Sequence, residues 1–90
     1  MDRYLETKRQ KNLAQHGLDF MDAERVFRGP TFTFEDDRYP YGEQRCITIG
    51  MLDLTMVVIA HTERNRTIRV ISMRKATKYE EKLYFKEILY

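Results

Sequence analysis

The sequence has little cysteine and no long apolar run, and each shortage excludes a class of protein. The single cysteine, Cys46, rules out an internal disulfide and favours a reducing compartment. Residues 1–6, MDRYLE, contain no apolar stretch, so no signal peptide is expected. No segment approaches the length of a membrane span. We therefore expect a cytoplasmic protein that does not bind membranes.

The net charge is too small to give the whole protein the strongly basic surface that marks many nucleic-acid-binding proteins. The 90 residues carry a formal net charge of +2, and 33% of them are charged while 42% are hydrophobic. This composition indicates one globular domain over residues 1–90 rather than a disordered chain. The charges are unevenly placed, because residues 64–75 hold five cations and no acid, whereas acids gather at residues 35–43.

No metal or nucleotide site is readable from the sequence. His16 and His61 are far apart, and there is no glycine-rich phosphate loop. We therefore expect neither a metal nor a cofactor. Cys46 and His61 are the residue types of a thiol nucleophile, although nothing in the sequence orients one toward the other.

The clearest strand signal lies at residues 67–75, TIRVISMRK. Its branched residues suit a pleated sheet, yet Arg69 lies within it and Arg74 near its end. One interpretation is that the strand holds phosphate-binding arginines in fixed positions. The other is that it lies at the edge of the sheet, where its charges prevent pairing with strands of other molecules. Regular alternation places the two arginines on opposite faces. A shared phosphate site therefore requires the strand to end early or to bulge near Met73.

Helical and strand periodicities predict the remaining elements. We expect helices at residues 4–16 and 19–28, strands at 31–36, 44–50 and 55–62, and a C-terminal helix after residue 77. Gly17 ends the first helix, Asp19 caps the second, Asn65 allows a tight hairpin turn, and Thr77 with Glu80 forms a capping box. The order predicts an α+β domain with two N-terminal helices, a four-stranded antiparallel sheet and a C-terminal helix. We expect the helices to cover one face and to leave a concave, partly polar surface on the other.

The first helix has a mixed surface. Leu5 and Leu13 are its expected apolar anchors. Lys8, Asn12 and His16 stand four apart and form one polar stripe, which is either a solvated face or a surface turned toward the basic strand.

Glu24 is the one acid expected among apolar neighbours. It lies four residues after Phe20 and three before Phe27, so helical spacing predicts that it shares their side. Because an unpaired buried charge is costly, we expect Glu24 to be buried beside a lysine or arginine.

Short motifs in a fixed order carry a family resemblance. They are NLAQHG at residues 12–17, DF at 19–20, AERVF at 23–27, DR at 37–38, YGEQR at 41–45, IG at 49–50 and ISMRKAT at 71–77, followed by Glu80 and Tyr84. Together, over residues 8–84, they resemble the BrnT family of bacterial type II toxins. The resemblance implies a RelE-like fold and a ribonuclease activity that arrests translation. It also implies a BrnA-like ribbon-helix-helix antitoxin as partner in a 2:2 heterotetramer. In this complex only the antitoxin would bind DNA.

The resemblance implies catalytic or RNA-binding roles for the charged residues. The expected catalytic residues of an RNA endonuclease are Lys8, Glu24, Arg64 and Arg74, and the expected RNA-binding residues are His16, Arg45, Arg69 and Lys75. The cations would stabilise charge on the scissile phosphate while the RNA 2′-hydroxyl attacks, without a metal. Glu24 would position a cation or take a proton. The alternative is a non-catalytic protein-interaction or nucleic-acid-binding module that uses the same basic face.

The chain departs from the family pattern in two places. Tyr4 and Leu5 stand where the family usually has an aromatic–Asp pair, and residues 51–54, MLDL, stand where an Asp-Gly turn is usual. Leucine in a hairpin turn exposes apolar surface. We expect this surface either to join the antitoxin interface or to accompany a different hairpin.

Overall fold

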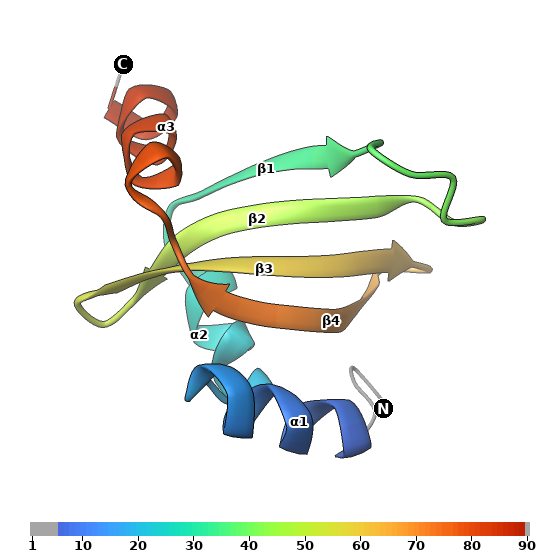
Figure 1. Cartoon of the computed structure of the whole chain (residues 1–90). Coiled ribbons are helices and arrows are strands. Elements are labelled where there is room, and N and C mark those ends of the chain that lie inside the picture. Colours follow the sequence, from blue (N-terminus) through green and yellow to red (C-terminus); the bar gives the residue numbers. More distant parts are fainter. Residues whose placement is uncertain (1–5, 90) are drawn as a thin grey trace.

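The computed structural model describes residues 6–89, which form one antiparallel sheet flanked by helices (Figure 1). The strand order is β1-β2-β3-β4, so each strand pairs with its neighbour in sequence. The elements are α1 (Glu6–His16), a 3-10 turn η1 (Phe20–Asp22), α2 (Ala23–Arg28), β1 (Thr31–Asp36), β2 (Arg45–Leu52), β3 (Thr55–Arg64), β4 (Thr67–Lys75) and α3 (Lys78–Leu89). The predicted α+β architecture is confirmed. Among the described residues, no helix is long and apolar enough to cross a membrane.

The β3–β4 connection is a two-residue turn. Arg64 pairs with Thr67, and the residues between them, Asn65 and Arg66, both have positive φ angles of 52° and 64°. Two left-handed residues give a turn whose twist matches that of the flanking strands. The hairpin predicted at Asn65 is therefore confirmed.

The β2–β3 hairpin contains the unusual turn sequence. Leu52 pairs with Thr55, so β2 runs two residues beyond its predicted end. Asp53 takes a left-handed conformation with φ 55° and forms an ion pair with Arg25 of α2. Aspartate tolerates this conformation better than most residues, which explains how the turn forms without glycine. Leu54 is 98% exposed, as expected for an apolar residue at a hairpin tip.

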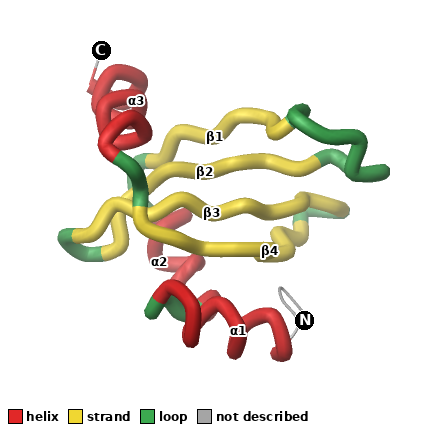
Figure 2. Tube along the Cα trace, in the orientation of Figure 1, coloured by secondary structure: helices red, strands yellow, loops and turns green. Residues whose placement is uncertain are grey.

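Strands β2 and β3 bury apolar side chains on both faces of the sheet. Val57 belongs to the buried cluster that contains Val26 of α2, whereas Val58 belongs to the cluster on the other face that contains Tyr84 of α3. The Tyr84 hydroxyl also donates to the Pro30 carbonyl at 2.9 Å. The prediction that helices cover only one face is wrong, because a sheet that is apolar on both sides needs cover on both. Figure 2 shows α3 at the end of the sheet opposite the β3–β4 turn.

A buried asparagine attaches α1 to β4. Asn12 is 6% exposed, and its amide nitrogen donates to the carbonyls of Met73 and Leu18 at 2.8 and 3.0 Å. Its oxygen accepts from the Met73 N–H at 3.1 Å. At Asn12, the polar stripe of α1 thus turns toward the basic strand. Leu13 is 38% exposed, so its prediction as a core anchor is wrong, and Leu5 lies outside the described residues.

The predicted boundaries between the N-terminal helices are present. Gly17 has a φ of 69°, and its N–H donates to the Leu13 carbonyl at 2.9 Å, which ends α1. Asp19 accepts a hydrogen bond from the Met21 N–H at 3.0 Å, which caps the following turn. The Arg9 guanidinium, 2.7 Å from Asp19, holds the pKa of that carboxyl below its ordinary value.

Candidate functional site

Strand β4 contains one extra residue relative to β3. Ala60 pairs with Ser72, but the next residue of β3, His61, pairs with Val70. The register therefore skips Ile71. Such a β-bulge reverses the alternation of side chains beyond it.

The bulge places two arginines on the same face. Val70 and Met73 are three residues apart, yet both are buried in the cluster beneath the N-terminal helices. Arg69 and Arg74 therefore share the other face, which is the face of α3. The bulge predicted near Met73 is confirmed, whereas the strand continues past that residue rather than ending early.

Arg74 is held by the first turn of α3. Its Nη1 and Nη2 donate to the two carboxylate oxygens of Glu80, both at 2.7 Å, and Nη1 also donates to the Lys75 carbonyl at 3.2 Å. Glu80 is fixed by the predicted capping box, because it accepts from the Thr77 N–H at 2.9 Å while its own N–H donates to the Thr77 hydroxyl. The hydrogen bonds from Arg74 lower the pKa of Glu80 to about 2.

A second arginine–carboxylate pair stands where β1 ends. Arg38 donates from Nε and Nη2 to the two oxygens of Asp36, at 2.7 and 2.9 Å, and the Tyr41 hydroxyl donates to the same carboxylate at 3.0 Å. Asp36 is 7% exposed, and the hydrogen bonds from Arg38 lower the pKa of its carboxyl to about 2. Both pairs are bidentate, which fixes the plane of each guanidinium.

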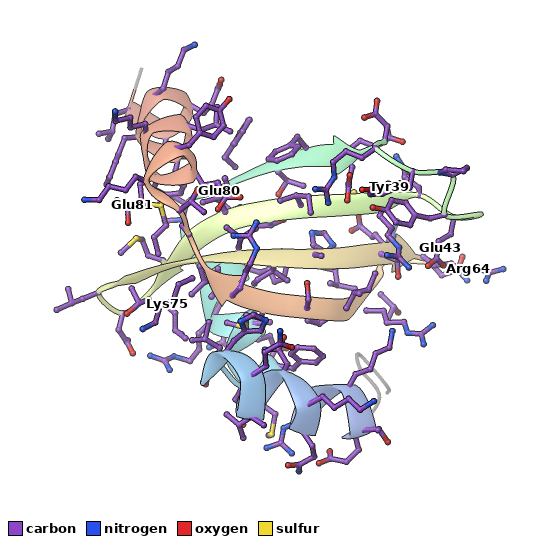
Figure 3. The ribbon with its side chains drawn as sticks, in the orientation of Figure 1. Tyr39, Glu43, Arg64, Lys75, Glu80 and Glu81 are labelled. Atoms are coloured by element: carbon purple, nitrogen blue, oxygen red, sulfur yellow. The ribbon has the colours of Figure 1, made fainter. Side chains whose placement is uncertain are left out.

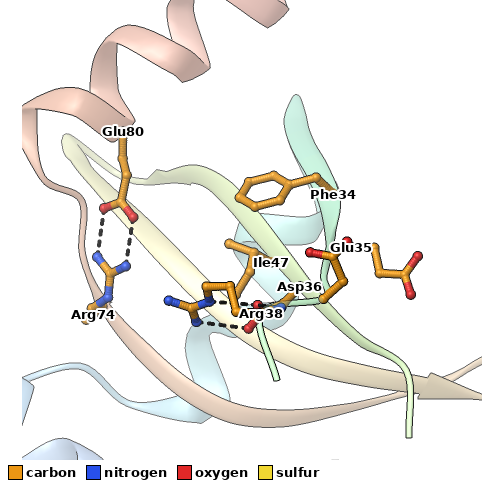
Figure 4. Close-up of a pocket in the computed structure, with 8 residues that line it drawn as sticks. Phe34, Glu35, Asp36, Arg38, Ile47, Arg74 and Glu80 are labelled. Carbon is orange, nitrogen blue, oxygen red and sulfur yellow. Dashed lines mark hydrogen bonds and ion pairs between the residues drawn. The ribbon is translucent and has the colours of Figure 1, made fainter. Parts of the chain in front are cut away.

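The two arginines face each other across a hollow of about 270 Å³, called here the arginine hollow. It is lined by Phe34, Glu35, Asp36, Asp37, Arg38, Ile47, Arg74 and Glu80. Figure 4 shows Arg38 between Asp36 and Arg74, with Glu80 at the end of the Arg74 guanidinium. Hydrogen bonds to Glu80 raise the pKa of Arg74, and the nearby charge of Arg38 opposes this rise.

Hydrogen-bonding capacity remains on both arginines. Within residues 6–89, Nη1 of Arg38 and Nε of Arg74 donate to no other group. A guanidinium has five N–H donors, so each arginine can keep its carboxylate and still bind an anion. The lining also includes the acidic residues Glu35 and Asp37, besides the two carboxylates that hold the arginines. Because acids surround the arginines, anion binding here depends on directed donors rather than on a diffuse positive field.

Arg45 extends the cationic surface along β2. It pairs with Asp36 across the strands, and its guanidinium carbon lies 4.0 Å from the centre of the Tyr41 ring. Its Nε is buried and has no hydrogen-bond partner among the described residues, while Glu43 is 3.7 Å away. The stacked ring therefore holds Arg45 in place and leaves an N–H donor unused.

The remaining residues predicted for the site lie elsewhere. Lys8 and Glu24 are exposed on α1 and α2, and His16 is the last residue of α1. Arg64 and Lys75 lie at opposite ends of the sheet (Figure 3). The predicted residues that strand alternation brings to the face of α3 are Arg45, Arg64, Arg69 and Arg74, with Arg64 at the β3–β4 end of the sheet.

The predicted burial of Glu24 is wrong. Its side chain is 52% exposed, and its carboxylate lies 3.9 Å from Arg28 on the same helix. The error arises because Phe20 belongs to a 3-10 turn and the α-helix begins at Ala23. The change in helical period rotates Glu24 away from the side that Phe20 occupies.

The thiol pair considered from the sequence is adjacent in space but is not activated. Cys46 and His61 are direct partners between β2 and β3. Burial raises the pKa of the Cys46 thiol and lowers the pKa of His61, whose Nε2 is 2.7 Å from the Thr48 hydroxyl. A reactive cysteine requires a lowered pKa, so this pair does not have the properties of a nucleophilic site. Among the described residues, no cluster of His, Cys, Asp and Glu could hold a metal ion.

Arg38 and Asp36 are the site residues that sequence reasoning missed. Arg38 appeared in the DR motif, and Glu80 in the capping box, but neither pattern indicates a partner across the sheet face. The only sequence feature that pointed to this pair was the spacing of Arg38, which follows the last residue of the predicted strand, Asp36, by two positions. Such spacing is common in turns, so it did not predict the hollow.

Comparisons with known proteins agree with the motif order. A family model described as "Ribonuclease toxin, BrnT, of type II toxin-antitoxin system" matches residues 4–80. A search of curated proteins finds no match to this chain.

Proposed function

Because the chain belongs to the BrnT family of ribonuclease toxins of type II toxin–antitoxin systems, we propose that it cleaves RNA internally at the arginine hollow. The observation that carries this proposal is the facing pair Arg38 and Arg74. Each guanidinium is fixed by a bidentate carboxylate and retains unused N–H donors. Fixed donors of this kind match the oxygens of a phosphodiester.

The proposed reaction uses the RNA itself as the nucleophile. The 2′-hydroxyl oxygen forms a bond to the adjacent phosphorus as it loses its proton to water, and the bond from phosphorus to the 5′-oxygen breaks as that oxygen gains a proton from water. Negative charge grows on the two non-bridging oxygens, which Arg38 and Arg74 stabilise through preorganised hydrogen bonds. In this proposal, no metal is needed, because the guanidiniums supply the positive charge.

Other residues of the same face take supporting roles. Arg45 and Arg69 would bind flanking phosphates, since they share the face of Arg74. Asp36 and Glu80 are positioning residues that hold the two arginines. The exposed Lys8 and Glu24 stand on helices that pack against the other face, so we propose no chemical step for them.

Membership of this family implies an antitoxin as partner. We propose a BrnA-like ribbon-helix-helix antitoxin that covers the arginine face and buries about 800 Å² or more per partner. Because such domains are dimers, two toxins would flank one antitoxin dimer. Light scattering on the co-purified complex tests this arrangement, and a strict one-to-one heterodimer at micromolar concentration would contradict it.

The test of the proposed activity is cleavage of purified RNA in the presence of a chelator. Arg74→Ala is expected to lower the cleavage rate by about a hundredfold or more, the effect of losing one preorganised charge. Arg66→Ala is the matched control, because Arg66 lies exposed in the β3–β4 turn and should matter little. Equal losses in both variants would indicate diffuse basic attraction. A folded protein that binds RNA without cutting it would support the non-catalytic alternative.

A further inference from the structure

Tyr39 is an aromatic residue that the fold leaves in solvent. It is 64% exposed in the β1–β2 connection, and Figure 3 places it at the end of the sheet that also carries Glu43 and Arg64. Pro40 follows it, and the Tyr41 N–H donates to the Tyr39 carbonyl at 3.0 Å. This hydrogen bond closes a three-residue turn and limits the freedom of the backbone that bears the ring.

The orientation of the Tyr39 ring is supported from one side. The ring lies edge-on to that of Tyr41, with centroids 5.7 Å apart and planes at 76°. Tyr41 is itself fixed, because its hydroxyl donates to Asp36 and Arg45 stacks over its ring. An exposed ring that is already oriented loses little conformational freedom when a flat partner stacks on it.

Arg38 connects this ring to the arginine hollow. Its guanidinium carbon lies 5.9 Å from the centre of the Tyr39 ring, and the same side chain lines the hollow opposite Arg74. A phosphate bound between Arg38 and Arg74 would therefore contact the guanidinium that approaches the Tyr39 ring. An RNA strand held in the hollow would reach the ring by passing Arg38.

We infer that Tyr39 is a stacking surface for one nucleobase of a single-stranded RNA whose phosphate occupies the arginine hollow. The inference rests on the proposed function and adds a substrate-positioning contact to it. Proteins that hold single strands combine cations for the backbone with aromatic rings for the bases. Every base has a flat face, so the contact is expected to select single-stranded RNA rather than a particular base. A nucleobase is favoured over a protein side chain because Arg38, which lies against the ring, also lines a hollow whose arginines can bind a phosphate.

The test uses two labelled probes that cannot be cut by 2′-hydroxyl attack. One is a short 2′-O-methyl oligonucleotide, and the other is the same sugar–phosphate chain without bases. Fluorescence anisotropy gives the dissociation constant of each. Tyr39→Ala is expected to weaken binding of the base-bearing probe by about 5- to 150-fold, the effect of losing one stacked base, and to leave the abasic probe unchanged. Tyr39→Phe keeps the ring and should bind both probes as the unmodified protein does.

Tyr79→Ala is the matched control, because Tyr79 is 75% exposed on α3 and, among the described residues, no arginine lies over its ring. It should bind both probes normally. Unchanged binding in Tyr39→Ala, or equal weakening of both probes, would overturn the inference. Unchanged probe binding together with weaker antitoxin binding would assign the ring to the protein interface instead. Failure of the proposed function is separable, since a protein that stacks the base but cuts no RNA refutes only the endonuclease proposal.

Discussion

The Glu80–Arg74 pair allows a quantitative test of how α3 holds the site. In Glu80→Gln, the side chain keeps its shape but loses its negative charge. The carboxylate whose two oxygens accept hydrogen bonds from Arg74 at 2.7 Å becomes a neutral amide. Hydrogen bonds to charged groups contribute about 1.5–3 kcal/mol each when they are well protected. The Arg74 side chain is 40% exposed, so solvent screening reduces this value. We therefore expect the free energy of unfolding to fall by about 2 kcal/mol in total, or roughly 8–16 °C in Tm.

The pH dependence of this loss has a defined sign. Arg74 lowers the pKa of Glu80 from 4.5 in ordinary surroundings to about 2 in the folded protein. The stabilisation from this pair is therefore complete above pH 4.5 and disappears as the pH falls toward 2. The stability difference between the unmodified protein and Glu80→Gln should thus be largest at neutral pH and should shrink in acid.

Urea unfolding followed by circular dichroism, at neutral and acidic pH, measures both effects. Glu81→Gln is the matched control, because the Glu81 carboxylate forms no ion pair within residues 6–89. We expect the control to change the free energy of unfolding by about 0.5 kcal/mol or less. If Glu80→Gln were equally neutral, or if its effect grew as the pH fell, the assignment of Glu80 as the group that holds Arg74 would be refuted.

Two further predictions concern the packing of the N-terminal helices. Asn12→Ala should lower the free energy of unfolding by about 3 kcal/mol, because it leaves buried backbone groups of Met73 without partners, and urea unfolding measures this loss. Gly50→Ala should cost about 1–3 kcal/mol, since the added Cβ would lie 2.7 Å from Val26 Cγ1. Gly29→Ala is its control, because the nearest heavy atom to a new Cβ there is 3.8 Å away, and a Tm equal to that of Gly50→Ala would contradict the explanation.

The regular part of the fold was largely predictable from the sequence. Strands β1 and β4 occupy the predicted ranges, because alternating and branched residues define them without help from distant contacts. The bulge near Met73 was also predictable. A regular strand would put Arg69 and Arg74 on opposite faces, so a phosphate site shared by both requires a bulge or an early strand end. The observed register contains the bulge.

The arrangement of the site depended on contacts that a sequence pattern does not contain. Arg38 reaches the hollow because the β1–β2 connection folds back onto Asp36, which lies two residues earlier. Glu80 meets Arg74 because α3 packs on the face that was expected to be free of helices. The error at Glu24 has a local cause, since a 3-10 turn before α2 changes the helical phase.

The most direct test of the shared phosphate site is a double-mutant cycle on Arg38 and Arg74. The measured quantity is kcat/KM for cleavage of purified RNA in chelator, using variants whose folding is verified by thermal unfolding. If both guanidiniums stabilise the same transition state, Arg38→Ala and Arg74→Ala should each lose about a hundredfold or more. The double variant should then lose far less than the product of the two losses, because residues that act as a unit are not additive. Normal cleavage by Arg38→Ala, or fully multiplicative losses, would contradict a single site between the two arginines.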